Sequence, residues 1–439
     1  MKVNNKSFQE DIKTHKDKFF NLNFSDPPYQ LGTKWEIDKQ TGRPIVKGKS
    51  KDFMNKWDGL DEKDLDLFFR ESFRTLKYGG FLLMFGMDRQ LFPLEYYAKL
   101  NGFEQQQSLY WFFSSSMPHT SDLSKNIDKK LGAEREIIGK KQHKGNLKKA
   151  IKNKIGYLGD NANKNNIKCF GYGEEILTKS KTELGKLWEG YKYSISPTKQ
   201  TNETMLVFKK PNKYGSPLND VLSNDKECSP SCLNIDESRI KTNDKWKRKE
   251  QYTEAHEGYK RKNRSSYTHK TEGEIHPNGR FPAQTFLSEE TAEILDKQGE
   301  EISKTCHICK YEEGDYDIYN YSPKVQNFER NFGVKSNKHP TLKPLKLLEH
   351  LANYFKLPIE QNVYIPFCGV YSEIIGFYKA GYDLNNIYGC ELDNEYIKIG
   401  KARLKARIEA DKKGQTDEQL KKIIKENKDT SNQSLMEYV

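Results

Sequence analysis

Residues 362–393 read NVYIPFCGVYSEIIGFYKAGYDLNNIYGCELD. An apolar run opens this segment, a turn around Gly369 follows, and a helical pattern then ends at Gly381. A second apolar run leads to the acidic Glu391. A strand, a glycine turn, a helix and a strand ending in an acid predict a βαβ unit of the nucleotide-binding type. The turn lets the backbone approach a ligand, and the acid accepts hydrogen bonds from sugar hydroxyls.

The N-terminal part of the chain shows the same alternation. Residues 81–85 form a continuous apolar run typical of a buried parallel strand, and residues 108–113 predict another. A helix begins at Asp61, and we expect it to end at Tyr78-Gly79-Gly80. Such alternation is typical of a doubly wound α/β domain. The other expected elements are a strand over 1–8, a strand leading to Asp26, and helices over 91–100, 345–355 and 395–410.

The alternation is interrupted in the middle of the chain, which is polar and rich in Lys and Asn. Only a helix start at 121–127 and a strand at 205–208 stand out, and residues 243–270 are close to low complexity. The α/β pattern resumes near His339. The sequence therefore predicts two halves of one α/β domain (residues 1–113 and 336–410), a basic insertion between them (114–335) and a charged tail (411–439).

A second informative segment is Phe24-Ser25-Asp26-Pro27-Pro28-Tyr29, which follows a short apolar run. Each proline fixes its own φ and donates no N–H, and the residue before a proline is held extended. The result is a stiff loop that presents a carboxylate, backbone carbonyls and a phenol ring. A carboxylate and a carbonyl can accept both hydrogens of an exocyclic amine, and an aromatic ring can stack on a base taken out of a duplex. A plain strand-to-turn connection that contains prolines is the alternative.

Composition limits the partners. The 439 residues carry a formal net charge of +12 and have a pI near 9.0. This balance favours a polyanionic partner, although a general bias towards Lys would give the same charge. No apolar run approaches the ~20 residues needed to span a bilayer, and the N-terminus lacks the apolar core of a signal peptide. We therefore expect a cytoplasmic protein with no membrane partner.

The seven cysteines form no obvious disulfide framework, because their number is odd and four of them lie in two tight pairs. One pair is Cys228 and Cys232, and the other is Cys306 and Cys309. Four thiolates at these spacings could hold a structural zinc ion, with His307 able to replace one of them. Two unrelated pairs of free thiols are an equally good interpretation.

Several motifs together resemble one family. They are His339-Pro340-Thr341-Leu342-Lys343-Pro344, Pro366-Phe367-Cys368-Gly369, Ser372-Glu373 and Glu391-Leu392-Asp393. With Asp26-Pro27-Pro28-Tyr29, they resemble the S-adenosylmethionine-dependent DNA amino-methyltransferases of the β-group, in which the catalytic motif precedes the cofactor motif. Phage and restriction-modification members are the most similar. The resemblance covers about residues 1–140 and 320–410 and implies a seven-stranded, Rossmann-like methyltransferase sheet with a large inserted target-recognition region.

The resemblance also implies roles for individual residues. A flipped target base would be held by Asp26, Pro27, Pro28 and Tyr29. S-adenosylmethionine would be bound by Lys343, Pro366, Phe367, Gly369, Ser372, Glu391 and Asp393. If the chain is such an enzyme, the Glu391 carboxylate has to lie beside the Gly369 turn.

The implied reaction is transfer of a methyl group to the exocyclic amine of a base in DNA. Asp as the first residue of the catalytic motif favours N6 of adenine, whereas Ser favours N4 of cytosine. N4-cytosine methylation and a catalytically silent DNA-binding relative stay open. The partner implied is DNA, and both a homodimer and a restriction endonuclease partner remain open.

The chain departs from the family pattern at three places. Ile365 stands where the family has an acid, and Tyr371 stands where it has a second glycine. A tyrosine in a turn that needs a positive φ would be strained. The family also has an acid near the adenine of the cofactor, where this chain reads Asn5-Lys6-Ser7, so we assign no contact there.

The insertion offers groups that suit nucleic acid. Trp188, Tyr191 and Tyr193 could stack on bases, or they could form a small core. The Lys-rich segments 140–154 and 245–264 could contact phosphates without choosing a sequence.

Overall fold

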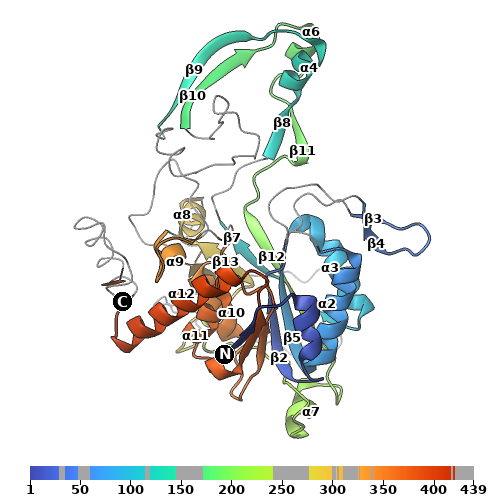
Figure 1. The fold of residues 1–439 in the computed structure, drawn as a ribbon, viewed down its shortest axis with the longest axis vertical. Helices are drawn as coiled ribbons and strands as arrows, with labels where there is room; N and C mark the ends of the chain where they lie inside the picture. Colours follow the sequence, from blue (N-terminus) through green and yellow to red (C-terminus); the bar gives the residue numbers. More distant parts are fainter. Residues whose placement is uncertain are drawn as a thin grey trace, which may run out of the picture.

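In the computed structural model of the chain, the described residues are 1–28, 35–47, 60–113, 119–144, 172–240, 276–298, 327–337, 341–416 and 419–420, with 303, 306–309, 325 and 339. Figure 1 shows a body built around one large sheet, and a narrow arm that projects from it. Tyr29, Cys169 and the whole low-complexity segment 243–270 lie outside the described residues.

The central sheet is ten-stranded and mainly parallel, with the strand order β1-β16-β15-β2-β5-β12-β7-β13-β14. Every neighbouring pair in this order is parallel except the two made by β12, which runs antiparallel to β5 and β7. The short β6 (Glu104–Gln105) also pairs with β12. The other strands are β1 (Lys2–Asn4), β2 (Phe20–Ser25), β5 (Leu76–Gly86), β7 (Leu109–Phe112), β12 (Asn202–Lys209), β13 (Thr285–Ser288), β14 (His307–Cys309), β15 (Val363–Ile365) and β16 (Ile387–Cys390).

Helices cover both faces of the sheet (Figure 1). One core packs α1 (Phe8–Asp11), α2 (Glu62–Thr75) and α3 (Asp88–Leu100) on the sheet, and includes Phe68 and Tyr97. The other core packs α10 (Leu345–Tyr354) and α11 (Ser372–Lys379), with α12 (Asn394–Lys412) beside them. Strands covered on both faces explain the continuous apolar runs in the sequence. The predicted α/β fold class is confirmed.

One predicted boundary is wrong. Tyr78-Gly79-Gly80 does not end the helix that starts at Asp61, because α2 ends at Thr75 and these residues lie inside β5. Leu76 already has extended backbone angles, and Tyr78 forms a bridge with Cys228. Gly79 has a φ of +74° and follows a backbone path that also accommodates the nearby Ser229 carbonyl. A glycine pair that reads as a helix end therefore serves as an irregularity within a strand.

The range 114–335 contributes to the sheet as well as to the arm. Strands β12, β13 and β14 come from this range and pair within the sheet. Other described elements of the range are α7 (Pro217–Leu222), α8 (Glu289–Gln298) and α9 (Asn327–Asn331). The predicted insertion therefore supplies part of the sheet itself, including its antiparallel strand β12.

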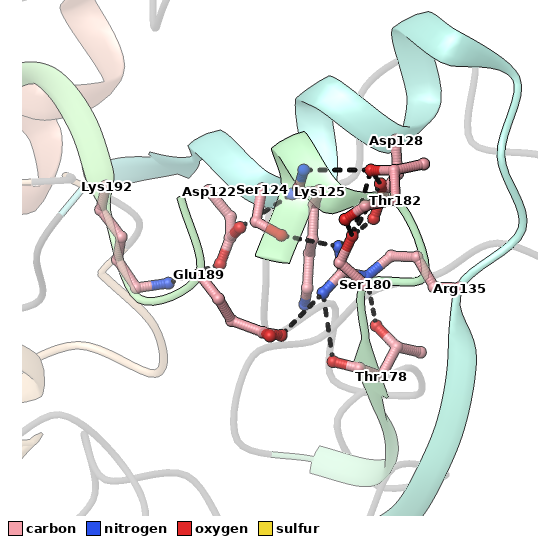
Figure 2. Close-up of polar contacts among 11 residues, drawn as sticks. Asp122, Ser124, Lys125, Asp128, Arg135, Thr178, Ser180, Thr182, Glu189 and Lys192 are labelled. Carbon is pink, nitrogen blue, oxygen red and sulfur yellow. Dashed lines mark hydrogen bonds and ion pairs between the residues drawn. The ribbon is translucent and has the colours of Figure 1, made fainter. Parts of the chain in front are cut away.

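We use the term arm for residues 119–144 and 172–196, which contain two small antiparallel sheets and two short helices. A salt bridge and four hydroxyls, those of Ser124, Thr178, Ser180 and Thr182, hold together the end of the arm that lies away from the body (Figure 1 and Figure 2). Asp128 accepts hydrogen bonds from Ser180 (2.9 Å) and Thr182 (2.6 Å) and pairs with Arg135. The elements of the arm are β8 (His119–Asp122), α4 (Leu123–Leu131), β9 (Glu136–Lys144), β10 (Tyr172–Lys179), α6 (Glu183–Leu187) and β11 (Lys192–Ser196).

A further pair of strands, β3 (Trp35–Ile37) and β4 (Pro44–Val46), forms a separate hairpin. Among the helices that the structure describes, none is long and apolar enough to cross a membrane.

Candidate active site

Three parallel strands end at one edge of the sheet, and the predicted site residues follow them. Asp26 comes after β2, Pro366 after β15 and Glu391 after β16. These strands are neighbours in the order β16-β15-β2. Because the carboxyl ends of parallel strands meet at the same edge, residues from the two ends of the chain come together there.

The acid and the glycine turn lie in direct contact. The Gly369 N–H donates a hydrogen bond to Glu391 Oε2 (2.9 Å), and the Asp393 N–H donates to Glu391 Oε1 (2.8 Å). Burial raises the pKa of Glu391, and these backbone hydrogen bonds oppose that rise. Each carboxylate oxygen can still accept a second hydrogen bond. The expected position of Glu391 beside the Gly369 turn is therefore what the structure shows.

The turn has an unusual backbone. Positive φ angles alternate along it, at Phe367 (+57°), Gly369 (+47°) and Tyr371 (+67°). A Cβ at position 369 would lie 2.9 Å from His339 Nε2, so a side chain there would collide with this ring. Left-handed angles at Phe367 and Tyr371 are strained, of order 1 kcal/mol each, and such strain needs support from the surrounding structure. The strain expected at Tyr371 is present.

The support for Tyr371 comes from α12. The Tyr371 ring is fully buried and lies against Gly400, where a Cβ would be 2.5 Å from ring atoms Cγ and Cδ1. Arg403, which is also buried, donates from Nη1 to the Val370 carbonyl (2.6 Å) and to Ser372 Oγ (3.1 Å). The tyrosine therefore projects into the core and lines no open surface of the turn.

Polar groups buried in β2 fix the approach to Asp26. Ser25 donates to Asn23 Oδ1 (2.9 Å), and Asn23 Nδ2 donates to Ser72 Oγ in α2 (2.9 Å). All three side chains are buried, so these bonds satisfy groups that would otherwise be costly in the core. Pro27, immediately after Asp26, is also buried. The carboxylate thus extends from a rigid strand end.

A buried lysine contacts that carboxylate. Lys343 Nζ lies 2.5 Å from Asp26 Oδ2 and 3.6 Å from Glu203 Oε2. The side chains of Lys343 and Glu203 are each 3% exposed, and that of Asp26 is 13% exposed. Burial opposes the charge of Lys343, but Asp26 and Glu203 raise its pKa, so the ammonium stays protonated.

A fourth charged group completes this cluster. Glu373, in the first turn of α11, is buried, and burial together with the negative charge of Asp26 raises its pKa to about 7. We use the term edge cluster for Asp26, Lys343, Glu203 and Glu373. Three carboxyl groups share one ammonium in a buried site, so the least stabilised of them holds a proton near neutral pH.

The remaining predicted residues take different positions. Phe367 packs against Phe8, with ring centroids 5.0 Å apart, and Pro366 is buried. The Asp393 side chain caps α12 by accepting from the Glu395 N–H (2.8 Å). Cofactor contacts of Lys343, Pro366, Phe367, Gly369, Ser372, Glu391 and Asp393 stay predictions, and Tyr29 lies outside the described residues.

The described cysteines give no support for zinc. Cys228 is buried, Cys232 is exposed and Cys306 is half-buried, and none of the three forms a disulfide. No group of three or more metal-ligating side chains occurs within the part of the chain that the structure describes. The Cys309 side chain is outside that part, so the four-thiolate site has no structural support.

Sequence reasoning missed Glu203 and Arg403 and assigned no role to Glu373 or His339. An acid in the strand sequence Asn202-Glu203-Thr204-Met205-Leu206 is a visible irregularity, because charged groups are rare in buried strands. Nothing local marks Arg403, which reads as one of many basic residues of an exposed helix.

The fold and the edge site define an α/β protein of the methyltransferase class. Residues 20–402 match the family model described as DNA methylase, of the N6/N4 type. This span covers most of the chain, and the protein therefore belongs to the N6/N4 DNA methylase family.

Solved structures that match the chain include the following three. The complex of M1.HpyAVI with S-adenosylmethionine is 12% identical, with 92% of this chain and 98% of that chain covered and a TM-score of 0.35. PvuII DNA methyltransferase (cytosine-N4-specific) is 11% identical, with 92% of this chain and 87% of that chain covered and a TM-score of 0.38. TTHA0409 of Thermus thermophilus, complexed with S-adenosyl-L-methionine, is 13% identical, with 92% of each chain covered and a TM-score of 0.33. Likeness at this level indicates nothing about activity. No curated protein matches the chain.

Proposed function

We propose that this protein transfers a methyl group from S-adenosylmethionine to the exocyclic amine of a flipped DNA base, with N6 of adenine as the favoured acceptor. One observation carries the proposal. The Asp26 carboxylate and the Glu391–Gly369 pair stand at the same edge of the sheet, after strands β2 and β16, which are separated only by β15. The group suited to hold the target amine therefore lies next to the group suited to bind the nucleoside part of the cofactor.

Glu391 and the turn are suited to hold the adenosine part of the cofactor. The carboxylate is fixed by two backbone N–H groups and keeps lone pairs that can accept from ribose hydroxyls. Phe367 offers an aromatic side chain at the turn, and Tyr371 points into the core instead of filling the site. When bound, S-adenosylmethionine supplies an electrophilic methyl group on a sulfonium.

Asp26 is suited to hold the amine. Its carboxylate can accept one amine hydrogen, and a backbone carbonyl of the Pro-Pro turn can accept the other. These bonds help to localise the nitrogen lone pair, which is otherwise delocalised into the base. The carboxylate also stabilises positive charge that develops on the nitrogen as the new bond forms. The nitrogen then loses a proton and becomes neutral again.

The choice of adenine rests on the identity of Asp26 as the first residue of the motif. The family includes enzymes for both amines, so N4 of cytosine is the alternative acceptor. The two bases present the same amine chemistry to a carboxylate and a carbonyl. Only identification of the product distinguishes them.

The arm is suited to contact DNA. Trp188 packs against Tyr191, but Trp188, Tyr191 and Tyr193 are 38%, 58% and 50% exposed, which favours the stacking alternative over a small core. Lys140 and Lys141 lie on β9 with exposed side chains. Basic and aromatic groups on a narrow projection can reach phosphates and bases together.

The test is direct product analysis. Purified protein is incubated with S-adenosylmethionine and unmethylated DNA of mixed sequence, and the DNA is digested to nucleosides and analysed by mass spectrometry. We expect N6-methyladenine with the wild-type protein and none with Asp26→Ala. Asp383→Ala is a matched control, because this aspartate precedes β16 and lies at the opposite end of that strand from Glu391.

Each outcome has a defined meaning. N4-methylcytosine would keep the reaction and change the base. Absence of both products, with DNA binding retained, would refute the proposed methyltransferase activity and indicate a catalytically silent DNA-binding relative. In that case a thermal shift with S-adenosylmethionine would show whether the Tyr371 turn still binds the cofactor, because a ligand that binds the folded state raises the melting temperature.

A further inference from the structure

The edge cluster presents a conflict that the proposed function alone does not resolve. Lys343 Nζ is 2.5 Å from Asp26 Oδ2, so an ammonium already neutralises the carboxylate that the target amine needs. A positive charge in that position weakens Asp26 as an acceptor. It also repels the positive charge that develops on the amine nitrogen. Movement of the ammonium away from Asp26 removes both effects when the base arrives.

Lys343 cannot withdraw into solvent. Its side chain is 3% exposed, and Nζ lies 4.7 Å from the centre of the Phe85 ring. An ammonium left without a partner in such a place is strongly destabilising. Any second position for it therefore needs another anion within the buried site.

Glu203 supplies that anion. Its Oε2 is 3.6 Å from Lys343 Nζ, and its side chain is also 3% exposed. Glu203 lies near the start of β12, which is antiparallel to its neighbours and so begins at the edge where β5 ends. The distance is short enough for rotation of the lysine side chain to exchange one carboxylate for the other.

We propose that Glu203 is a positioning residue that draws the Lys343 ammonium away from Asp26, so that Asp26 can accept the target amine. This inference rests on the proposed function. Glu203 touches neither base nor cofactor in this scheme and acts only through Lys343. In the resting protein the Lys343 ammonium offsets the repulsion between the carboxylates of Asp26 and Glu203, and during the reaction it leaves Asp26.

The first test needs no turnover. Asp26→Asn and Glu203→Gln each leave Lys343 with one of its two ion-pair partners, and Glu373 is unchanged in both, so we expect each single variant to unfold near the wild-type temperature. The double variant removes both ion-pair partners and should lose much more stability than the two single losses added together. Additive losses would show that Glu203 does not hold the lysine and would overturn the proposal.

The second test measures the chemical step under single-turnover conditions with saturating S-adenosylmethionine. In Glu203→Gln the lysine stays on Asp26, and we expect the methylation rate to fall roughly 10- to 100-fold, the size of effect typical for a buried charged contact. Affinity for S-adenosylmethionine should not change. Glu104→Gln is the matched control, because Glu104 pairs with Lys209 of β12 (2.8 Å) on a more exposed part of the same sheet.

Rescue separates positioning from a general structural role. Lys343→Met added to Glu203→Gln removes the ammonium beside Asp26, so the double variant should be faster than Glu203→Gln alone. Because Lys343 is also a predicted cofactor contact, both variants are compared at S-adenosylmethionine concentrations shown to saturate each of them. A double variant no faster than the single variant would overturn the proposal. If the wild-type protein methylates nothing, the proposed function fails, and the stability comparison of Asp26→Asn with Glu203→Gln still decides whether the two carboxylates share Lys343.

Discussion

Asp128 and Asp26 are two of the aspartates that pair with basic side chains in this protein, and their surroundings differ. In the arm, Asp128 is paired with Arg135 and also accepts hydrogen bonds from Ser180 and Thr182 (Figure 2). At the sheet edge, Asp26 is contacted by Lys343, which lies near a second carboxylate as well. The arm has many donors for one acid, whereas the edge cluster has several acids for one donor.

The difference separates a structural pair from an exchangeable one. The hydroxyls of Thr182 and Ser180 lower the pKa of Asp128 together with Arg135, and several donors therefore fix this acid in place. Such a network holds α4 against α6 and has one arrangement. The edge cluster has an excess of negative charge, seen in the raised pKa of Glu373, and its lysine has a choice of partners. Excess of one charge sign in a buried site is typical of functional clusters.

The largest expected effect distinguishes the two aspartates by the same substitution. Asp26→Asn should lower the single-turnover methylation rate roughly 100- to 1,000-fold, because the developing charge on the amine loses its counter-charge. Its melting temperature should stay near that of the wild type. Asp128→Asn should instead destabilise the arm, measured as faster proteolytic cleavage between residues 119 and 196. Normal activity of the Asp26→Asn protein would show that Asp26 is not a functional acid.

The pH dependence of stability should come from the edge cluster. The pKa of Glu373 is raised to about 7 in the folded protein, against 4.5 for the free side chain. Its contribution is therefore complete below about pH 4.5 and is lost as pH rises through 7, a loss of roughly 3 kcal/mol. Urea unfolding at pH 4.5, 6 and 8 should show this decline in the wild type.

Glu373→Gln is the control for that measurement, because it removes the titrating group and keeps the shape of the side chain. Its decline over the same pH range should be smaller. Equal declines in the two proteins would place the titration elsewhere. Asp128 contributes in the opposite sense, since its lowered pKa stabilises the fold above pH 3.8 and that stability is lost in stronger acid.

The space around Gly185 in the arm leaves no room for a side chain. A Cβ on Gly185 would lie 2.5 Å from Asp128 Oδ1 and closer still to Ser180 Oγ. Gly185→Ala should therefore cost about 1–3 kcal/mol, as for other overpacked sites. The measurement is hydrogen exchange in α4 and α6, with Gly139→Ala as a control, because Gly139 lies in the arm without a positive φ and has no neighbour within 4 Å. Affinity for S-adenosylmethionine should not change, and a loss of that affinity would show that the arm and the edge are coupled.

The smallest expected effect concerns the surface of the arm. If the arm contacts phosphates, Lys141→Ala should reduce the slope of log affinity for DNA against log salt concentration by about 1. Lys398→Ala, an exposed lysine on α12, should leave the slope unchanged. Filter binding at several salt concentrations measures both. Equal slopes for Lys141→Ala and the wild type would exclude a phosphate contact by this residue.

Most of the fold could be predicted because it follows local patterns. Buried parallel strands gave continuous apolar runs at residues 81–85 and 362–367, and the turn and acid of the βαβ unit are close together in sequence. The motif Asp26-Pro27-Pro28 was equally visible. The end of α2 was placed wrongly because a glycine pair has the same appearance at a helix end and within a strand.

The α/β class, the two carboxylates at the sheet edge and the departure at Tyr371 could be predicted from local sequence, since each depends on residues near one another in the chain. The groups that surround them are brought there by the folded structure. Lys343 reaches Asp26 across 317 residues, and Arg403 supports the turn from a helix that reads as a solvated surface. Glu203 enters from a strand that runs antiparallel to its neighbours. Burial then gives these distant charges their strength, because a low-dielectric interior leaves each of them dependent on the few partners that the fold supplies.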